Sequence, residues 1–139
     1  DEIKLPDLEQ GKKQELLRNK LKIASPDRLR IIAQSMREGL EISEINQITK
    51  YDKWFLEQIN DLINIEKQVQ ENGLPNNYDD LYFLKAQGFS DKRLAKLTGK
   101  SEDEVKELRQ NLGVKPSFTR IDSCAGEFET PTSYMYSVY

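Results

Sequence analysis

The sequence predicts an all-α fold: an irregular helical bundle of about six to eight helices with an internal pseudo-repeat and an extended C-terminal tail. Three observations support this class. Apolar residues recur at steps of three or four through most of residues 12–113, which is the period of an amphipathic helix. Capping residues and glycines divide that region at intervals typical of helices. Charged residues make up 32% and hydrophobic residues 37% of the 139 positions, which suits a small helical protein.

The first half opens with an arm, residues 1–11, and continues with helices that carry clear start and stop signals. Ser25 is expected to cap a helix whose first position is Pro26 and which ends at Gly39. Asp52 is expected to cap a longer helix. The helices predicted in this half cover residues 12–22, 26–38, 42–48 and 53–71.

The second half carries equally clear helix signals. Ser90 begins a helix that ends at Gly99. Ser101 and Glu104 form a capping box, in which each side chain can accept a hydrogen bond from a backbone amide of the first turn. The helices predicted here cover residues 79–86, 90–98 and 101–112.

The helical periodicity also predicts which side chains form the core. Phe55 and Ile59 lie one turn apart and are expected to face it, whereas Trp54 is expected to bridge to adjoining helices. The predicted core residues are Leu29, Ile32, Phe55, Ile59, Leu94, Leu97, Val105 and Leu108.

The chain resembles itself at an offset of 49 positions. Gly39, Leu40, Ile45, Ile48, Thr49, Leu56 and Ile59 match Gly88, Phe89, Leu94, Leu97, Thr98, Val105 and Leu108. Two copies are fewer than a solenoid needs, so we expect one globular bundle with internal pseudo-symmetry.

Residues 117–139 differ in character from the rest. They have no helical period and hold five of the twelve aromatic residues of the chain. The stretch "SYMYSVY" alternates and is compatible with a strand, although it has no obvious partner. We therefore divide the chain into a helical domain, residues 1–116, and an extended tail, residues 117–139. The aromatic residues expected to dock onto a partner are Phe128, Tyr134, Tyr136 and Tyr139.

Composition excludes several classes of function. The net charge of −3 argues against nucleic-acid binding, which usually involves a basic excess. The absence of histidine removes Ser-His and Cys-His catalysis. No apolar run approaches the ~20 residues of a membrane span. The single cysteine, Cys124, cannot form an internal disulfide, and we expect a cytoplasmic protein. Because the chain starts without methionine, we expect it to be part of a longer protein.

An independent helix-turn-helix binding module is the alternative function. The stretch from Gly88 to Gly113 reads as two short helices joined by a tight turn. The second helix of such a module enters the major groove of DNA, but here it opens with Glu102, Asp103 and Glu104, which would repel phosphates. This alternative is therefore disfavoured by its charge.

The residues show no catalytic, cofactor-binding or metal site. The sequence contains no glycine-rich phosphate loop. Its carboxylates are spread over helix surfaces and concentrate at helix N-termini, where the helix dipole favours them. We therefore expect neither ATP nor Mg²⁺ to bind this chain itself.

Three stretches together resemble the oligomerisation domain of the carbamoyl phosphate synthetase large chain, over roughly residue 12 to the end. The most specific is the tail motif "DSCAGEF" followed by "YMYSVY". Ser123 and Val138 stand where this family usually has threonine. The other two stretches are "ITKYDKWFLEQINDLINIE" and "GFSDKRLAKLTGKSEDEVKELR".

The resemblance implies more than the periodicity does. It implies a non-catalytic scaffold between two ATP-grasp halves of an ATP-dependent ligase, which makes carbamoyl phosphate from bicarbonate, ATP and glutamine-derived ammonia for pyrimidine and arginine synthesis. ATP and Mg²⁺ would bind other parts of that enzyme. The implied partners are the flanking halves, other large subunits and the small glutaminase subunit, with no nucleic acid and no membrane. The tail would lead toward the next ATP-grasp half.

Overall fold

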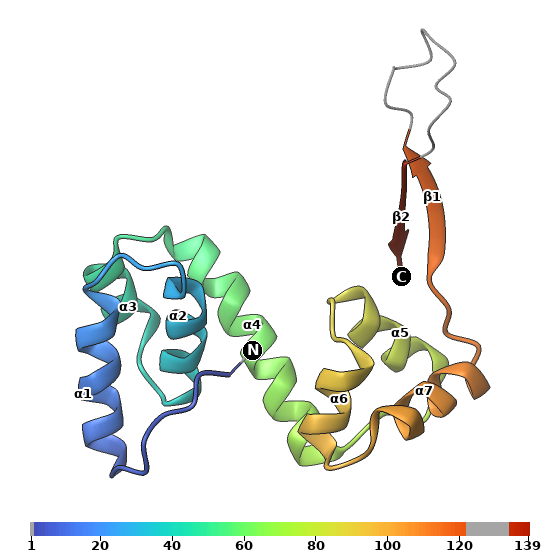
Figure 1. Ribbon diagram of the computed structural model, residues 1–139, viewed down its shortest axis with the longest axis horizontal. Helices are drawn as coiled ribbons and strands as arrows, with labels where there is room; N and C mark the ends of the chain where they lie inside the picture. The colour runs from blue at the N-terminus through green and yellow to red at the C-terminus, as the bar shows by residue number, and fades with distance from the viewer. Residues whose placement is uncertain (1, 122–133) are drawn as a thin grey trace, which may run out of the picture. The chain divides into compact units, whose positions relative to one another are not determined.

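The computed structural model describes residues 2–121 and 134–139, and these residues form seven helices and two strands (Figure 1). The predicted all-helical class is confirmed, with a small hairpin at the C-terminal end. In chain order the elements are α1 (Gln10–Leu21), α2 (Arg28–Arg37), α3 (Ile42–Thr49), α4 (Lys53–Asn72), α5 (Tyr78–Ala86), α6 (Asp91–Thr98), α7 (Glu102–Asn111), β1 (Ser117–Ile121) and β2 (Tyr134–Val138).

The chain forms two compact units, Asp1–Lys67 (unit 1) and Gln68–Tyr139 (unit 2), and the division falls within α4. The sequence predicts one globular bundle, and this expectation is corrected. Each copy of the repeated helix pair buries its own apolar face, so each copy closes a core of its own. The predicted boundary between residues 116 and 117 stays a prediction.

Unit 1 is built around side chains from all four of its helices. Leu17 and Leu21 of α1, Ile32 of α2, Ile45 of α3 and Leu56 of α4 are completely buried. Each buried leucine or isoleucine contributes about 1.5–3 kcal/mol by leaving water. The apolar positions of these helices repeat every three or four residues, so each helix presents one stripe to this core.

Unit 2 has a core of its own, to which α5, α6 and α7 contribute. Leu81, Leu94 and Val105 are completely buried, one from each helix, and Val114 joins them from the segment after α7. Ser90 and Ser101 cap α6 and α7, and the predicted capping box of Ser101 and Glu104 is present.

The internal repeat is visible in the helix boundaries. α3 and α6 both begin and end 49 residues apart, and α4 and α7 begin 49 residues apart. The residue after α3, Lys50, and its counterpart after α6, Gly99, both adopt the left-handed conformation, with φ of 60° and 68°. The two copies therefore share one backbone design despite different side chains.

Several side chains expected in the core lie elsewhere. Leu29 is 47% exposed, so its prediction is wrong: α2 turns Ile31, Ile32 and Met36 inward instead. Trp54 is 67% exposed and does not bridge helices as expected, because Leu56 occupies the buried side of α4.

The remaining predicted core residues divide into two groups. Ile32, Leu94, Leu97 and Val105 are buried. Phe55, Ile59 and Leu108 are only partly buried.

The start of α2 also differs from the prediction. The helix begins at Arg28, after Asp27, and not at Pro26. The hydroxyl of Ser25 is buried without a hydrogen-bond partner, whereas its carbonyl accepts from the Arg28 amide at 3.1 Å. Residues 25–27 form a turn ahead of the helix, and Ser25 is not a cap.

The tail contains a hairpin within the chain. β1 and β2 pair antiparallel, from Ser117 opposite Val138 to Ile121 opposite Tyr134. The strand proposed for "SYMYSVY" therefore exists, and its partner is the segment directly after the helices. No local pattern predicts this pairing, because residues 122–133 separate the two strands in the chain and no short turn motif joins them.

Candidate interaction surfaces and the charge cluster of unit 2

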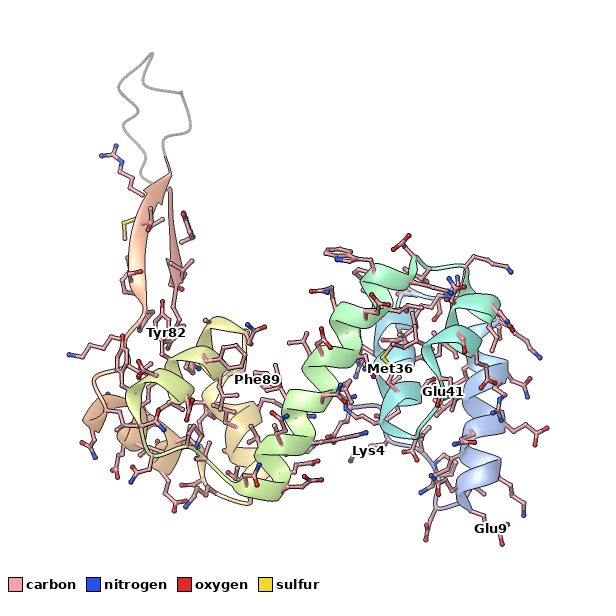
Figure 2. The ribbon with its side chains drawn as sticks, turned by 180° about the vertical axis from the view of Figure 1, so that it is seen from behind. Lys4, Glu9, Met36, Glu41, Tyr82 and Phe89 are labelled. Carbon is pink, nitrogen blue, oxygen red and sulfur yellow. The ribbon has the colours of Figure 1, made fainter. Side chains whose placement is uncertain are left out.

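A cluster of three charged side chains lies inside unit 2, next to the backbone of Phe89, which Figure 2 labels. The ammonium of Lys85 donates to a carboxylate oxygen of Asp91 at 2.8 Å and to the carbonyl of Phe89 at 2.8 Å. Nε of Arg109 donates to the other carboxylate oxygen of Asp91 at 3.0 Å, and its Nη1 donates to the carbonyl of Val114 at 3.2 Å. The cluster thus joins α5, α6 and α7. The backbone carbonyls of Phe89 and Val114 accept hydrogen bonds from its two cations.

The electrostatics of this cluster favour the charged state of its carboxylate. Burial alone would raise the pKa of Asp91, but the hydrogen bonds and positive charges of Lys85 and Arg109 outweigh it. The pKa of Asp91 therefore lies below its ordinary value, and this carboxylate is ionised at neutral pH.

Unit 1 carries two ion pairs between helices. Arg37 of α2 donates to both carboxylate oxygens of Glu66 on α4, at 2.8 and 3.1 Å. Arg18 of α1 pairs with Glu44 of α3, and this hydrogen bond lowers the pKa of Glu44 and raises that of Arg18. These pairs join α2 to α4 and α1 to α3.

The predicted docking residues have different surroundings. Tyr136 is 47% exposed in β2. Tyr139 is partly buried, and its ring centroid lies 5.0 Å from the ammonium of Lys85. Tyr134 is the first residue of β2, and Phe128 lies outside the described residues.

The hairpin exposes further apolar side chains that the sequence reading missed. Phe118 is 69% and Met135 is 62% exposed. In the register of the hairpin Phe118 lies opposite Ser137, and Met135 opposite Arg120. Residues that lie opposite one another share a face of a strand pair, so Met135 and Phe118 are on one face and Tyr136 is on the other. Both faces therefore present large apolar groups to solvent.

Three aromatic residues of α5 are also exposed, namely Tyr78, Tyr82 and Phe83. The rings of Tyr78 and Tyr82 stack with centroids 5.7 Å apart. The α5 helix is apolar around most of its circumference, which explains why periodicity alone did not single out an exposed face.

The second helix of the possible helix-turn-helix module, α7, begins with acidic residues. The first turn of α7 contains Glu102, Asp103 and Glu104, and all three are exposed. Hydrogen bonds from the backbone and hydroxyl of Ser101 hold the pKa of Glu104 below its ordinary value. The first turn of α7 is thus negatively charged at neutral pH.

Neither a cluster of metal ligands nor a membrane-spanning helix occurs in the part of the chain that the structure describes. Among residues 2–121 and 134–139 there is no group of three or more acidic or cysteine side chains placed to hold a metal ion. No helix in this part of the chain has the length and apolar character to cross a bilayer. What the geometry provides is helical cores, interhelical ion pairs and exposed apolar faces, which are features of an association module.

Comparison with known proteins agrees with this assessment. Residues 2–113 match the family described as "Carbamoyl-phosphate synthetase large chain, oligomerisation domain". The whole chain is 47% identical to a carbamoyl phosphate synthase large chain of Brucella melitensis and 46% identical to that of Rhizobium meliloti, and it covers 12% of each. It is 43% identical, over 88% of its length, to 10% of an arginine-specific large chain of Arabidopsis thaliana named as chloroplastic.

The chain therefore spans about an eighth of the relatives that it matches most fully, which locates the likeness in one region of a much longer protein. With a family match over residues 2–113 and identity near one half over its full length, the chain belongs to the family of carbamoyl phosphate synthetase large chain oligomerisation domains.

Proposed function

We propose that this chain is a non-catalytic scaffold and oligomerisation segment of a carbamoyl phosphate synthase large chain. Family membership carries this proposal. ATP and Mg²⁺ would bind the ATP-grasp halves, and the parent would be the ATP-dependent ligase that makes carbamoyl phosphate for pyrimidine and arginine synthesis. A reducing compartment such as the cytoplasm suits the single cysteine.

The hairpin is the part of the chain best suited to contact the catalytic parts. An isolated two-stranded hairpin is marginally stable in water, and here both of its faces expose large apolar side chains, Phe118 and Tyr136 among them. Covering such side chains contributes about 1.5–3 kcal/mol each. We therefore assign residues 1–116 to the scaffold and residues 117–139 to docking on the neighbouring ATP-grasp half. Other large subunits and the glutaminase subunit are the further proposed partners.

A binding experiment tests this docking role. The purified chain is mixed with the separately produced remainder of a large chain, and complex formation is measured by size-exclusion chromatography. We expect co-elution that weakens when Phe118→Ser and Tyr136→Ser are combined. The control is Ile23→Ser, because Ile23 is an equally exposed apolar residue in unit 1. Equal loss of binding in the control, or no loss in the hairpin variant, would contradict the docking role.

A further inference from the structure

The two copies of the repeat differ where unit 2 holds its charges. Lys85, Asp91 and Arg109 lie 49 positions after Met36, Ile42 and Asn60. Met36 is buried in the core of unit 1, and Ile42 packs against that core. The same backbone arrangement is therefore completed by two apolar side chains and an amide in one copy, and by three charges in the other.

Burying these three charges has a free-energy cost that apolar side chains at the same positions would avoid. Lys85 is buried, at 7% exposure, and a buried charge loses its hydration. Replacing a buried ion pair or triad by well-packed apolar residues is often neutral or stabilising. At the positions that correspond to the cluster, unit 1 packs without charges, and its own ion pair of Arg37 and Glu66 lies at other positions. Folding of the corresponding helices in unit 2 therefore does not explain the cluster.

The cluster instead fixes the ammonium of Lys85 in one position. The carbonyl of Phe89 and the carboxylate of Asp91 each accept from it at 2.8 Å. Arg109 in turn holds Asp91 from α7. Because these hydrogen bonds hold the ammonium in one place, it offers a fixed positive charge to an adjacent side chain.

What Lys85 contacts next is the end of the hairpin. Its ammonium lies 5.0 Å from the ring centroid of Tyr139, within the range of a cation–π interaction. A pocket of about 360 Å³ lies between this end of the hairpin and the turn that joins α5 to α6. Lys85, Gly88, Phe89, Ser137, Val138 and Tyr139 are among the residues that line it.

We propose that Lys85, held by Asp91 and Arg109, is a latch that fastens Tyr139 and thereby fixes the direction in which the hairpin leaves the helices of unit 2. The charges of the cluster serve this latch, and unit 1 lacks them because it carries no hairpin among its described residues. The inference does not depend on which partner covers the hairpin.

Hydrogen exchange of backbone amides in the intact chain tests the latch. The variants are Lys85→Met and the triple variant Lys85→Met, Asp91→Ile, Arg109→Asn, which restores the residues of unit 1. We expect exchange of the β1 and β2 amides to accelerate about three- to thirtyfold, the range that a cation–π contact supports. In the triple variant, amides of α5, α6 and α7 should stay within about twofold of the wild type, because no charge of the cluster is left without its partners. Lys85→Met alone leaves Asp91 without one partner and should accelerate exchange in these helices as well. The matched control is Lys92→Met, since Lys92 is an exposed lysine on α6.

Two further variants keep the proposal testable if Lys85→Met does not fold. Tyr139→Phe retains the aromatic ring and should leave hairpin exchange unchanged. Tyr139→Leu removes the ring and should accelerate exchange as Lys85→Met does. Equal behaviour of Tyr139→Leu and Tyr139→Phe would overturn the latch, as would faster exchange in the helices with unchanged exchange in the hairpin.

Discussion

At the scale of single residues, two neighbouring side chains on α4 should contribute unequally to the free energy of unfolding. Leu56 is completely buried and Phe55 only partly, although the sequence favours Phe55 as the core residue. Leu56→Ala should lower the free energy of unfolding by about 2–5 kcal/mol, as for other buried leucines. Phe55→Ala should cost less, because Phe55 mainly stacks on Tyr51, with ring centroids 5.8 Å apart. Urea denaturation of both variants measures the order, and a larger loss for Phe55→Ala would restore the original assignment.

Asp91 makes the stability of unit 2 depend on pH. Its pKa is lower when folded than when unfolded, so the charged form stabilises the fold at neutral pH. This contribution should be lost as the pH falls below about 4, the ordinary value of an aspartate, toward the lower folded pKa. Asp91→Asn should therefore be less stable than the wild type at pH 7, with a difference that shrinks below pH 4. Denaturation midpoints across this range test it, with the exposed Asp103→Asn as control; a difference that grows at low pH would contradict the sign.

At the scale of elements, the two serines proposed as helix caps should now behave differently. Ser101 caps α7 with its hydroxyl, whereas the hydroxyl of Ser25 has no hydrogen-bond partner. Ser101→Ala should destabilise the chain by about 0.5–2 kcal/mol, the usual loss for a cap. Ser25→Ala should cost little or even stabilise, because it removes a buried hydroxyl that lacks a partner. Equal losses in urea denaturation would show that Ser25 caps α2 after all.

The sequence predicts the helices of this protein far better than its tertiary arrangement. Caps and glycines act within a few residues, so signals such as Ser101 and Gly99 locate α6 and α7 closely. Which residue faces a core depends on neighbouring helices, and this is why Leu29 and Trp54 were misassigned. The pairing of β1 with β2 and the Lys85 cluster both depend on contacts between separate elements, which no local pattern encodes. The offset of 49 could have identified the cluster, since it aligns three charges with Met36, Ile42 and Asn60.

At the scale of the whole molecule, the chain forms two pseudo-repeated helical units, one of which ends in an apolar hairpin. Among the described residues, the buried apolar side chains all lie at or before Val114, so we expect the helical cores to form without the hairpin. Deleting residues 130–139 should therefore leave the helical circular dichroism and the thermal midpoint nearly unchanged. Loss of the cooperative thermal transition in this deletion would show that the hairpin is part of the core.

Sedimentation velocity over a range of protein concentrations measures whether this chain is an association module. We expect the sedimentation coefficient of the wild-type chain to rise reversibly with concentration, as for an oligomerisation domain. If the chain sediments as a monomer at every concentration, alone and in the presence of the remainder of a large chain, it is not an association module.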